Sequence, residues 1–252
     1  MNGYALITGA SSGIGEEFAY QLASKGYNLI LVARRKSLLE AIALKITKTH
    51  NVEVRVIISD LSIPQEIEKL IQSIQDIGPI SYLVNNAGFA NVGNIDEVDW
   101  EKQQSLINVH TLAPTRLIHA ILPTMRENNQ GVIINVSSIS AFAPGGVYSA
   151  TKSYLVTLSK GLKKSLKDYN IIVQALCPGF VYSGFHQTTE YKDAKLDVYS
   201  KVPNFLWMDA NKVVEVSLKS VKKRKIVVIP SWRHKLTLRI AQLGIANRYR
   251  YK

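Results

Sequence analysis

The chain alternates between short apolar runs rich in β-branched residues and longer segments whose apolar residues recur at helical spacing. The runs that predict strands are Tyr4–Thr8, Leu29–Val32, Val54–Ile58, Tyr82–Val84, Val132–Val136, Ile171–Leu176 and Ile226–Ile229. The segments that predict helices run from Ile14 to Gly26 and then cover Leu38–Thr47, Glu66–Ile77, Trp100–Met125 and Ser149–Leu166. This alternation predicts an α/β fold, a doubly wound parallel sheet with helices on both faces. We expect residues 1–252 to form one domain that ends in a basic helical extension from about residue 219.

A glycine-rich turn separates the first predicted strand from the first predicted helix. The residues from Thr8 to Gly15 read T-G-A-S-S-G-I-G. Glycines let the backbone bend tightly and approach a pyrophosphate, and the N–H groups and dipole of the following helix favour its negative charge. The spacing is G-x3-G-x-G, so the common G-x-G-x-x-G fingerprint is matched only in part. An ordinary glycine turn is the alternative, and the flanking strand and helix favour a phosphate-binding loop.

Composition limits the class of protein and its location. Cys177 is the single cysteine, which excludes an internal disulfide framework and fits a reducing compartment. We interpret it as a small buried apolar side chain. The longest apolar runs, such as Leu29–Ala33, are too short to span a bilayer, and Met1 leads into the first strand without a signal peptide. We therefore expect a cytoplasmic protein.

The net charge of +12 is concentrated at the C-terminal end. Residues 219–252 contain eleven Lys or Arg residues and no Asp or Glu, which leaves +1 on the first 218 residues. The apolar residues that share one helical face in this segment are Trp232, Leu236, Ile240 and Leu243. Ser231 is placed to cap such a helix and Gly244 to end it.

Two interpretations of this basic amphipathic helix stay open. Packing against the body of the domain is the preferred one, and peripheral contact with an anionic membrane is the alternative. Nucleic-acid binding is not expected, because no recognised module accompanies the charge.

Two arginines at the end of the second predicted strand bear on the choice of cofactor. An Asp or Glu in this position binds the ribose hydroxyls of NAD, whereas a guanidinium pairs with the additional phosphate of NADP. Here Arg34 and Arg35 occupy it, which predicts NADP(H), although both could simply begin a solvated helix. Asp60, after the third strand, could meet the adenine or serve only as an acid at a helix N-terminus.

Tyr148 and Lys152 form the candidate catalytic pair. They lie one helical turn apart, so the ammonium can stabilise the phenolate and lower the pKa of Tyr148. Such a phenol can act as a general acid near neutral pH. The pair alone is weak evidence in a chain with 12 tyrosines, but Ser138 follows a strand and Asn108 lies in the long predicted helix.

Taken together and in this order, the motifs resemble those of the classical short-chain dehydrogenase/reductase family over nearly the full length of the chain. The turn Thr8–Gly15 is similar to its T-G-x-x-x-G-I-G pattern, Asn85–Gly88 to its N-N-A-G motif and Pro178-Gly179 to its P-G motif. The residues that match its catalytic positions are Asn108, Ser138, Tyr148 and Lys152. The resemblance implies a Rossmann fold, an oxidoreductase and a homodimer or homotetramer.

The resemblance also implies a role for each matched residue. Tyr148 would exchange a proton with the substrate oxygen as hydride moves to or from the nicotinamide, and Lys152 would lower its pKa and bind the ribose. Ser138 would hydrogen-bond the carbonyl, and Asn108 would position a water that connects Lys152 to solvent. The residues expected to contact the cofactor are Gly9, Ser11, Ser12, Gly13, Ile14, Gly15, Arg34, Arg35, Asp60, Asn86, Ala87, Gly88, Tyr148, Lys152, Pro178, Gly179, Val181 and Ser183.

The spacing between the serine and the tyrosine departs from the family pattern. Only nine residues separate Ser138 from Tyr148, about three fewer than the family has. The intervening loop must be tighter, and Pro144-Gly145-Gly146 provides the turn residues. Ser137 is the alternative to Ser138.

The expected substrate is an apolar carbonyl compound or its alcohol. The residues expected near the nicotinamide are Phe89, Ala90, Val92, Ala141, Phe142 and Ala143. The irregular segment Val181–Val202 is the expected lid. Its aromatic and histidine residues, which could equally be ordinary loop anchors, are Tyr182, Phe185, His186, Tyr191 and Tyr199. The sequence thus predicts an NADP(H)-dependent oxidoreductase, and the alternative is a non-catalytic dinucleotide sensor or membrane-surface scaffold that uses the basic tail.

Overall fold

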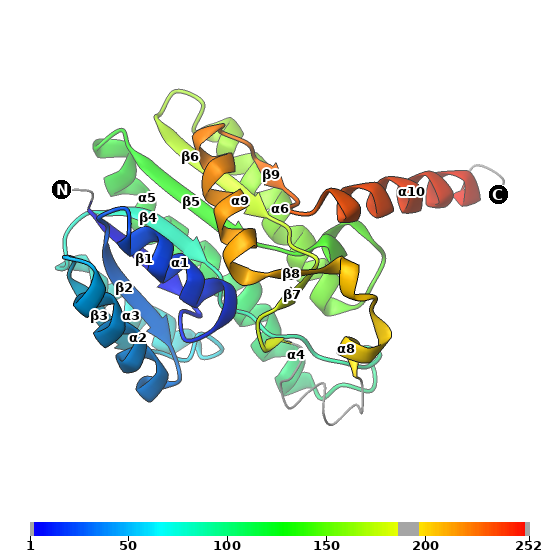
Figure 1. Ribbon diagram of the computed structural model, residues 1–252, viewed down its shortest axis with the longest axis horizontal. Coiled ribbons are helices and arrows are strands. Elements are labelled where there is room, and N and C mark those ends of the chain that lie inside the picture. The colour runs from blue at the N-terminus through cyan, green and yellow to red at the C-terminus, as the bar shows by residue number, and fades with distance from the viewer. Residues whose placement is uncertain (1–2, 186–196, 250–252) are drawn as a thin grey trace.

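A seven-stranded parallel sheet forms the centre of the molecule, with strand order β3-β2-β1-β4-β5-β6-β9 (Figure 1). The computed structural model describes residues 3–185 and 197–249, with side chains as far as residue 240. The strands are β1 (Tyr4–Thr8), β2 (Asn28–Ala33), β3 (Val54–Ile58), β4 (Ile80–Asn85), β5 (Gly131–Val136), β6 (Ile171–Leu176) and β9 (Val227–Val228). The strand order reverses direction between β1 and β4, which is where open α/β sheets bind ligands.

Helices cover both faces of the sheet, as the alternating pattern predicts. The helices on one face are α1 (Gly13–Ala23), α2 (Lys36–Thr49) and α9 (Ala210–Lys222). Those on the other face are α3 (Pro64–Gln75), α5 (Ala113–Glu127) and α6 (Val147–Ser165). Alternate residues of β1 enter the two cores, with Ile7 in the first and Leu6 in the second, because a central strand is buried on both sides.

The region after β6 departs most from the predicted elements. β7 (Phe180–Tyr182) and β8 (Trp207–Asp209) form a separate two-stranded parallel sheet, with the short helix α8 (Val198–Lys201) between them in the chain. Sequence patterns predicted neither this small sheet nor α9, and β9 is two residues shorter than predicted.

The long helix predicted over Trp100–Met125 is interrupted. It consists of α4 (Trp100–Ile107), a π-helical turn (Asn108–Leu112) and α5. Pro114 lies in the first turn of α5 and has no N–H for the carbonyl of His110, so a regular α-helical hydrogen bond cannot form there. Such π-turns within helices are frequent at functional sites.

The C-terminal helix α10 (Trp232–Tyr249) extends away from the rest of the molecule (Figure 1). Ser231 caps it as predicted, since its hydroxyl accepts a hydrogen bond from the N–H of His234 at 3.4 Å. The predicted stop at Gly244 is wrong, because the helix continues past it, and a single glycine costs an exposed helix only about 1 kcal/mol. None of the described helices is both long and apolar enough to cross a membrane.

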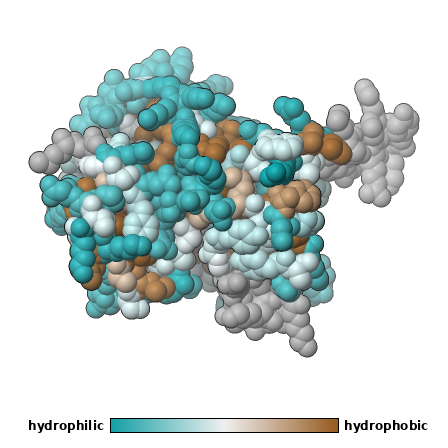
Figure 2. Space-filling model, in the orientation of Figure 1, coloured by the Kyte–Doolittle hydropathy of each residue, from teal (hydrophilic) through white to brown (hydrophobic). Residues whose placement is uncertain are grey.

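The preferred interpretation of the tail, a helix packed against the body, holds for the first turns of α10, but the packed face is not the apolar one. Trp232, Leu236 and Ile240 are 65%, 51% and 61% exposed. Hydrophobic residues accordingly appear on the surface where the helix leaves the body (Figure 2). The helix instead contacts the body through the opposite face, which carries the buried His234 and the partly buried Leu238.

Candidate functional site

A cavity of about 720 Å³ lies at the carboxyl ends of the central strands. All the residues predicted to contact the cofactor line it except Gly15, and Ser138 lines it as well. These residues come from the loops that follow the strands of the large sheet, from the starts of α1 and α6, and from β7, so the sheet is what brings them together. The location agrees with the rule for open parallel sheets.

The glycine turn has the backbone geometry of an anion-binding loop. Gly9 and Gly13 have φ angles of 65° and 58°, which favour glycine. A Cβ on Gly15 would lie 2.3 Å from the carbonyl oxygen of Gly9, so Gly15 lets the helix pack against the turn rather than facing the cavity. Ser12 begins α1 and its side chain makes no capping hydrogen bond. The turn and the helix N-terminus therefore fit a pyrophosphate.

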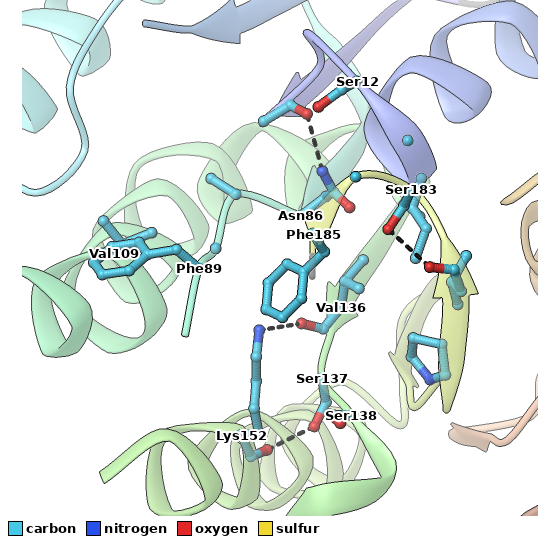
Figure 3. A pocket seen from close by; sticks show the side chains of 18 of the residues that line it. Ser12, Asn86, Phe89, Val109, Val136, Ser137, Ser138, Lys152, Ser183 and Phe185 are labelled. Carbon is cyan, nitrogen blue, oxygen red and sulfur yellow. Dashed lines mark hydrogen bonds between the residues drawn. The ribbon is translucent and has the colours of Figure 1, made fainter. Parts of the chain in front are cut away.

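The N-N-A-G segment fastens the end of β4 to the end of β1. The Asn86 amide donates hydrogen bonds to the carbonyl oxygens of Thr8 and Gly9 at 2.9 and 3.2 Å, and Figure 3 draws one of them. The Thr8 hydroxyl oxygen accepts from the N–H groups of Asn86 and Ala87, each at 3.0 Å. Asn86 therefore connects the ends of these two strands.

The two arginines after β2 adopt different arrangements. Arg35 donates to the hydroxyl oxygens of Ser11 and Ser12 at 2.8 and 2.6 Å, which holds its guanidinium beside the glycine turn. Arg34 lies 3.6 Å from Asp60. Burial raises the pKa of Asp60, but hydrogen bonds from Ser62 and the charge of Arg34 outweigh it and keep this pKa below its usual value. An anionic group beside the turn would meet the Arg35 guanidinium together with both serine hydroxyls.

The two adjacent serines after β5, Ser137 and Ser138, make different contacts. Ser137 is buried and donates to the backbone carbonyl of Lys152 at 2.7 Å, which attaches α6 to the end of the strand (Figure 3). Ser138 is partly exposed in the cavity, and its hydroxyl oxygen accepts from the N–H of Ser140 at 3.1 Å. This arrangement leaves the Ser138 hydroxyl proton available to a ligand and supports Ser138 over Ser137.

Although the loop between Ser138 and Tyr148 is shorter than the family pattern, Tyr148 lines the cavity. A 3₁₀ turn (Ile139–Phe142) follows Ser138, and Gly146 then caps α6. A Cβ on Gly145 would lie 2.3 Å from the hydroxyl oxygen of Ser149, so the glycine permits the tight approach that the loop requires.

Lys152 is buried beneath the same cavity. Its ammonium donates to the carbonyl oxygen of Val136 at 3.1 Å and lies 5.6 Å from the centre of the Tyr148 ring. Burial lowers the pKa of Lys152 to about 8. The structure thus brings Ser138, Tyr148 and Lys152 to one place, with the charge of the lysine close to the phenol.

Asn108 does not join this group. Its side-chain amide donates to the carbonyl oxygen of Ser62 at 2.8 Å, and it does not line the cavity. The π-turn instead directs His110, two residues further on, toward Phe89 and Thr151, although His110 does not line the cavity either. The sequence analysis missed His110 because a continuous α-helix gives no sign of this change in phase.

His110 connects the loop after β4 to the start of α6. Its Nε2 accepts from the N–H of Phe89 at 3.3 Å, and its Nδ1 lies 2.9 Å from the Thr151 hydroxyl oxygen. Because Nε2 accepts, the proton is on Nδ1 and is donated to Thr151, which in turn donates to the carbonyl oxygen of Tyr148 at 2.9 Å. The imidazole is 1% exposed, and burial followed by the nearby charge of Lys152 holds the pKa of His110 well below its usual value.

The substrate side of the cavity is apolar, but only some of the residues that were predicted to lie there line it. Phe89, Ala143 and Phe185 do, and the Phe185 ring lies 6.2 Å from that of Tyr148. The predicted residues that do not line it are Ala90, Val92, Ala141 and Phe142. Ala90 is buried, and the 3₁₀ turn directs Ala141 and Phe142 into a small core around Cys177.

Of the described residues of the predicted lid, Val181, Ser183, Gly184 and Phe185 line the cavity. Tyr182 and Tyr199 stack on Trp207, with ring centres 4.9 and 4.4 Å from the indole, so these two tyrosines anchor the small β7–β8 sheet. His186 and Tyr191 lie outside the described residues.

Two buried residues, His234 and Cys177, lie next to the Pro178-Gly179 motif. A Cβ on Gly179 would lie 2.2 Å from the imidazole of His234, so glycine is needed where α10 meets the cavity wall. Neither ring nitrogen of His234 has a hydrogen-bond partner among the described residues. Cys177 is free and buried, as expected, and burial raises its pKa to about 12.

Comparisons with known proteins show the family of this chain. A family model described as short chain dehydrogenase matches residues 3–194. A human protein named inactive hydroxysteroid dehydrogenase-like protein 1 is 33% identical over 183 residues, which cover 71% of this chain and 56% of the human protein. The chain therefore spans little more than half the length of that relative.

Two solved bacterial structures match almost the whole chain. A short-chain dehydrogenase from Sphingobium yanoikuyae in complex with NADPH is 32% identical, with a TM-score of 0.83, and the match covers 98% of this chain and 96% of that one. A bulky-bulky ketone specific alcohol dehydrogenase from Comamonas testosteroni is 30% identical, with a TM-score of 0.79 and coverage of 97% and 93%. With its fold, its cavity and these matches, the chain belongs to the short-chain dehydrogenase family of oxidoreductases.

Proposed function

We propose that this protein reduces an apolar ketone or aldehyde, or oxidises the matching alcohol, with NADP(H) as the cofactor. The observation that carries the proposal is the convergence of Ser138, Tyr148 and Lys152 on one cavity whose remaining wall is largely apolar. The name of the Comamonas relative, a ketone specific alcohol dehydrogenase, supports the substrate class.

The cavity residues have distinct tasks in such a reaction. Ser138 donates a hydrogen bond to the carbonyl oxygen and holds it beside Tyr148, which supplies the proton to that oxygen. The buried Lys152 ammonium stabilises the phenolate that remains. Phe89 and Phe185 exclude water and pack against the apolar part of the substrate.

The opposite end of the cavity would hold the dinucleotide. The turn from Gly9 to Gly15 fits the pyrophosphate, and Arg35 with Ser11 and Ser12 fits the additional phosphate of NADP. When bound, the cofactor supplies the hydride for the carbonyl carbon. The complex of the Sphingobium relative with NADPH supports the choice of cofactor.

A conservative variant tests the proposed proton donor. Tyr148→Phe keeps the ring that packs against His110 and Phe185 but removes the hydroxyl. We expect NADPH binding within about three-fold of the wild type and a loss of ketone reduction on the order of 1,000-fold. Turnover at the wild-type rate would exclude Tyr148 as the donor.

A non-catalytic role as a dinucleotide sensor is the second candidate, because the human relative is named inactive. A panel of ketones, aldehydes and alcohols separates the two candidates. Turnover of any of them that disappears in Tyr148→Phe supports the reductase, whereas tight NADPH binding without turnover across the panel supports the sensor.

We also propose that the protein is a cytoplasmic homo-oligomer that acts on a small molecule. Family resemblance supports the oligomer, and light scattering of the purified full chain measures it.

A further inference from the structure

Helix α10 has an exposed apolar face and a buried face. Trp232, Leu236 and Ile240 are four residues apart and therefore share one side of the helix. His234 and Leu238 face the body, and Leu238 lines the cavity. The three exposed residues, here named the apolar stripe, lie on a helix that extends away from the body (Figure 1).

Basic side chains flank both edges of the apolar stripe. At 3.6 residues per turn, Arg233 falls on one edge, and Lys235 and Arg239 fall on the other. All three are exposed, and the segment 219–252 contains no acidic residue. The guanidinium of Arg233 lies 5.2 Å from the centre of the Trp232 ring. The exposed side of α10, with apolar side chains between two rows of cations, is similar to the lipid-facing side of interfacial helices, whereas its opposite side packs on the body through His234 and Leu238.

We infer that α10 binds the surface of an anionic lipid bilayer through the apolar stripe. An anionic surface complements the basic edges, and long basic side chains can reach the headgroups while the stripe enters the acyl boundary. Trp232 matches the preference of tryptophan for the membrane interface. A second copy of the chain is a poorer occupant, because an antiparallel or parallel pair of these helices would bring basic residues against basic residues.

This arrangement would place one wall of the catalytic cavity next to the membrane. Leu238 lines the cavity from the same helix, and the 3₁₀ turn that follows Ser138 contacts α10. The inference does not depend on catalysis, because lipid binding can be measured without turnover.

Vesicle co-sedimentation of the full chain tests the inference. We expect binding to vesicles of phosphatidylcholine with phosphatidylglycerol and at least ten-fold weaker binding to phosphatidylcholine alone. Replacing the apolar stripe in a W232S/L236S/I240S variant should reduce binding to the anionic vesicles by more than ten-fold. Replacing the basic edges in an R233Q/K235Q/R239Q variant should reduce binding to the anionic vesicles by a factor on the order of 100, since each cation strengthens this binding about five-fold.

Two matched controls separate the helix from general properties of the surface. Leu44→Ser removes an apolar residue that is 56% exposed on α2, and K160Q/K163Q/K164Q removes three exposed lysines from α6. Both should bind anionic vesicles within about three-fold of the wild type. Thermal melting should show that all variants fold, since the replaced side chains of α10 are exposed.

Tryptophan emission gives an independent readout. In a W100F variant, Trp232 is the exposed indole, because Trp207 is only 7% exposed. Its emission should shift to shorter wavelength with anionic vesicles. No binding to these vesicles, or equal binding by the α10 variants and controls, would overturn the inference. Self-association that depends on the apolar stripe, without vesicle binding, would overturn it in favour of a second copy.

Discussion

Replacement of His110 by leucine is the sharpest test of how the site is supported. Leucine has a similar volume, so the change removes hydrogen bonds without opening a large cavity. The N–H of Phe89 loses its acceptor and Thr151 loses a donor. An unsatisfied buried group costs about 1–3 kcal/mol, and we therefore expect a loss of about 2–4 kcal/mol in the free energy of unfolding at pH 7.5.

The pH dependence of stability gives this prediction a specific signature. His110 is neutral when folded because its pKa lies well below the usual value, whereas the unfolded chain protonates it near pH 6.5. Below that pH the unfolded state binds one more proton, so the wild type loses about 1.4 kcal/mol per pH unit through this group as the pH falls. Between pH 6.5 and pH 5 this amounts to about 2 kcal/mol, and the His110→Leu variant should lack that part of the loss.

Urea unfolding at pH 7.5, 6.5 and 5 measures both effects. His119→Leu is the matched control, because it removes an exposed imidazole from α5 and should change stability at pH 7.5 by no more than about 0.5 kcal/mol. A catalytic readout separates positioning from stability, since the variant should lower kcat for ketone reduction more than it raises KM. An unchanged pH slope in His110→Leu would refute a buried neutral imidazole.

Three further predictions concern the cofactor and the catalytic groups. Arg35→Asp should raise the dissociation constant of NADPH by more than ten-fold and that of NADH by much less, as measured by fluorescence titration, and equal effects would contradict the phosphate assignment. Ketone reduction should fall as the pH rises through about 8, where Lys152 loses its charge, and a flat profile from pH 7 to 9.5 would argue against that role. Gly15→Ala should lower the melting temperature by several degrees, because a Cβ there lies 2.3 Å from the Gly9 oxygen, and an unchanged value would show that the turn can relax.

Local sequence patterns were sufficient for the sheet and for most of the candidate site. Apolar runs predicted all seven strands of the large sheet. The inner strands need continuous apolar sequence because they are buried on both faces, whereas the edge strand β3 is only partly buried. The glycine turn, Tyr148 with Lys152, and Ser138 all follow predicted strands or begin predicted helices. Once the strands are parallel, their carboxyl ends lie at one edge, and these residues must meet there.

The predictions that were wrong or left open concern residues whose surroundings depend on contacts between distant segments. The stacking of Tyr182 and Tyr199 on Trp207 forms only when β7 pairs with β8, so these rings could not be assigned to the loop or to the cavity in advance. Ala141 and Phe142 turn toward Cys177 because a 3₁₀ turn, rather than an extended loop, follows Ser138.

The sequence by itself determined the family, the α/β fold and the catalytic pair, since each depends on residues close together in the chain. The tertiary structure decided that His110 rather than Asn108 hydrogen-bonds to the loop after β4 and to the start of α6, because a π-turn changes the direction of every side chain after it. It also decided that α10 exposes its apolar stripe, because the buried face of that helix is selected by its contact with Gly179 and the cavity wall. Helical periodicity reveals that a face is apolar, but only the packing of the whole chain determines whether that face is covered.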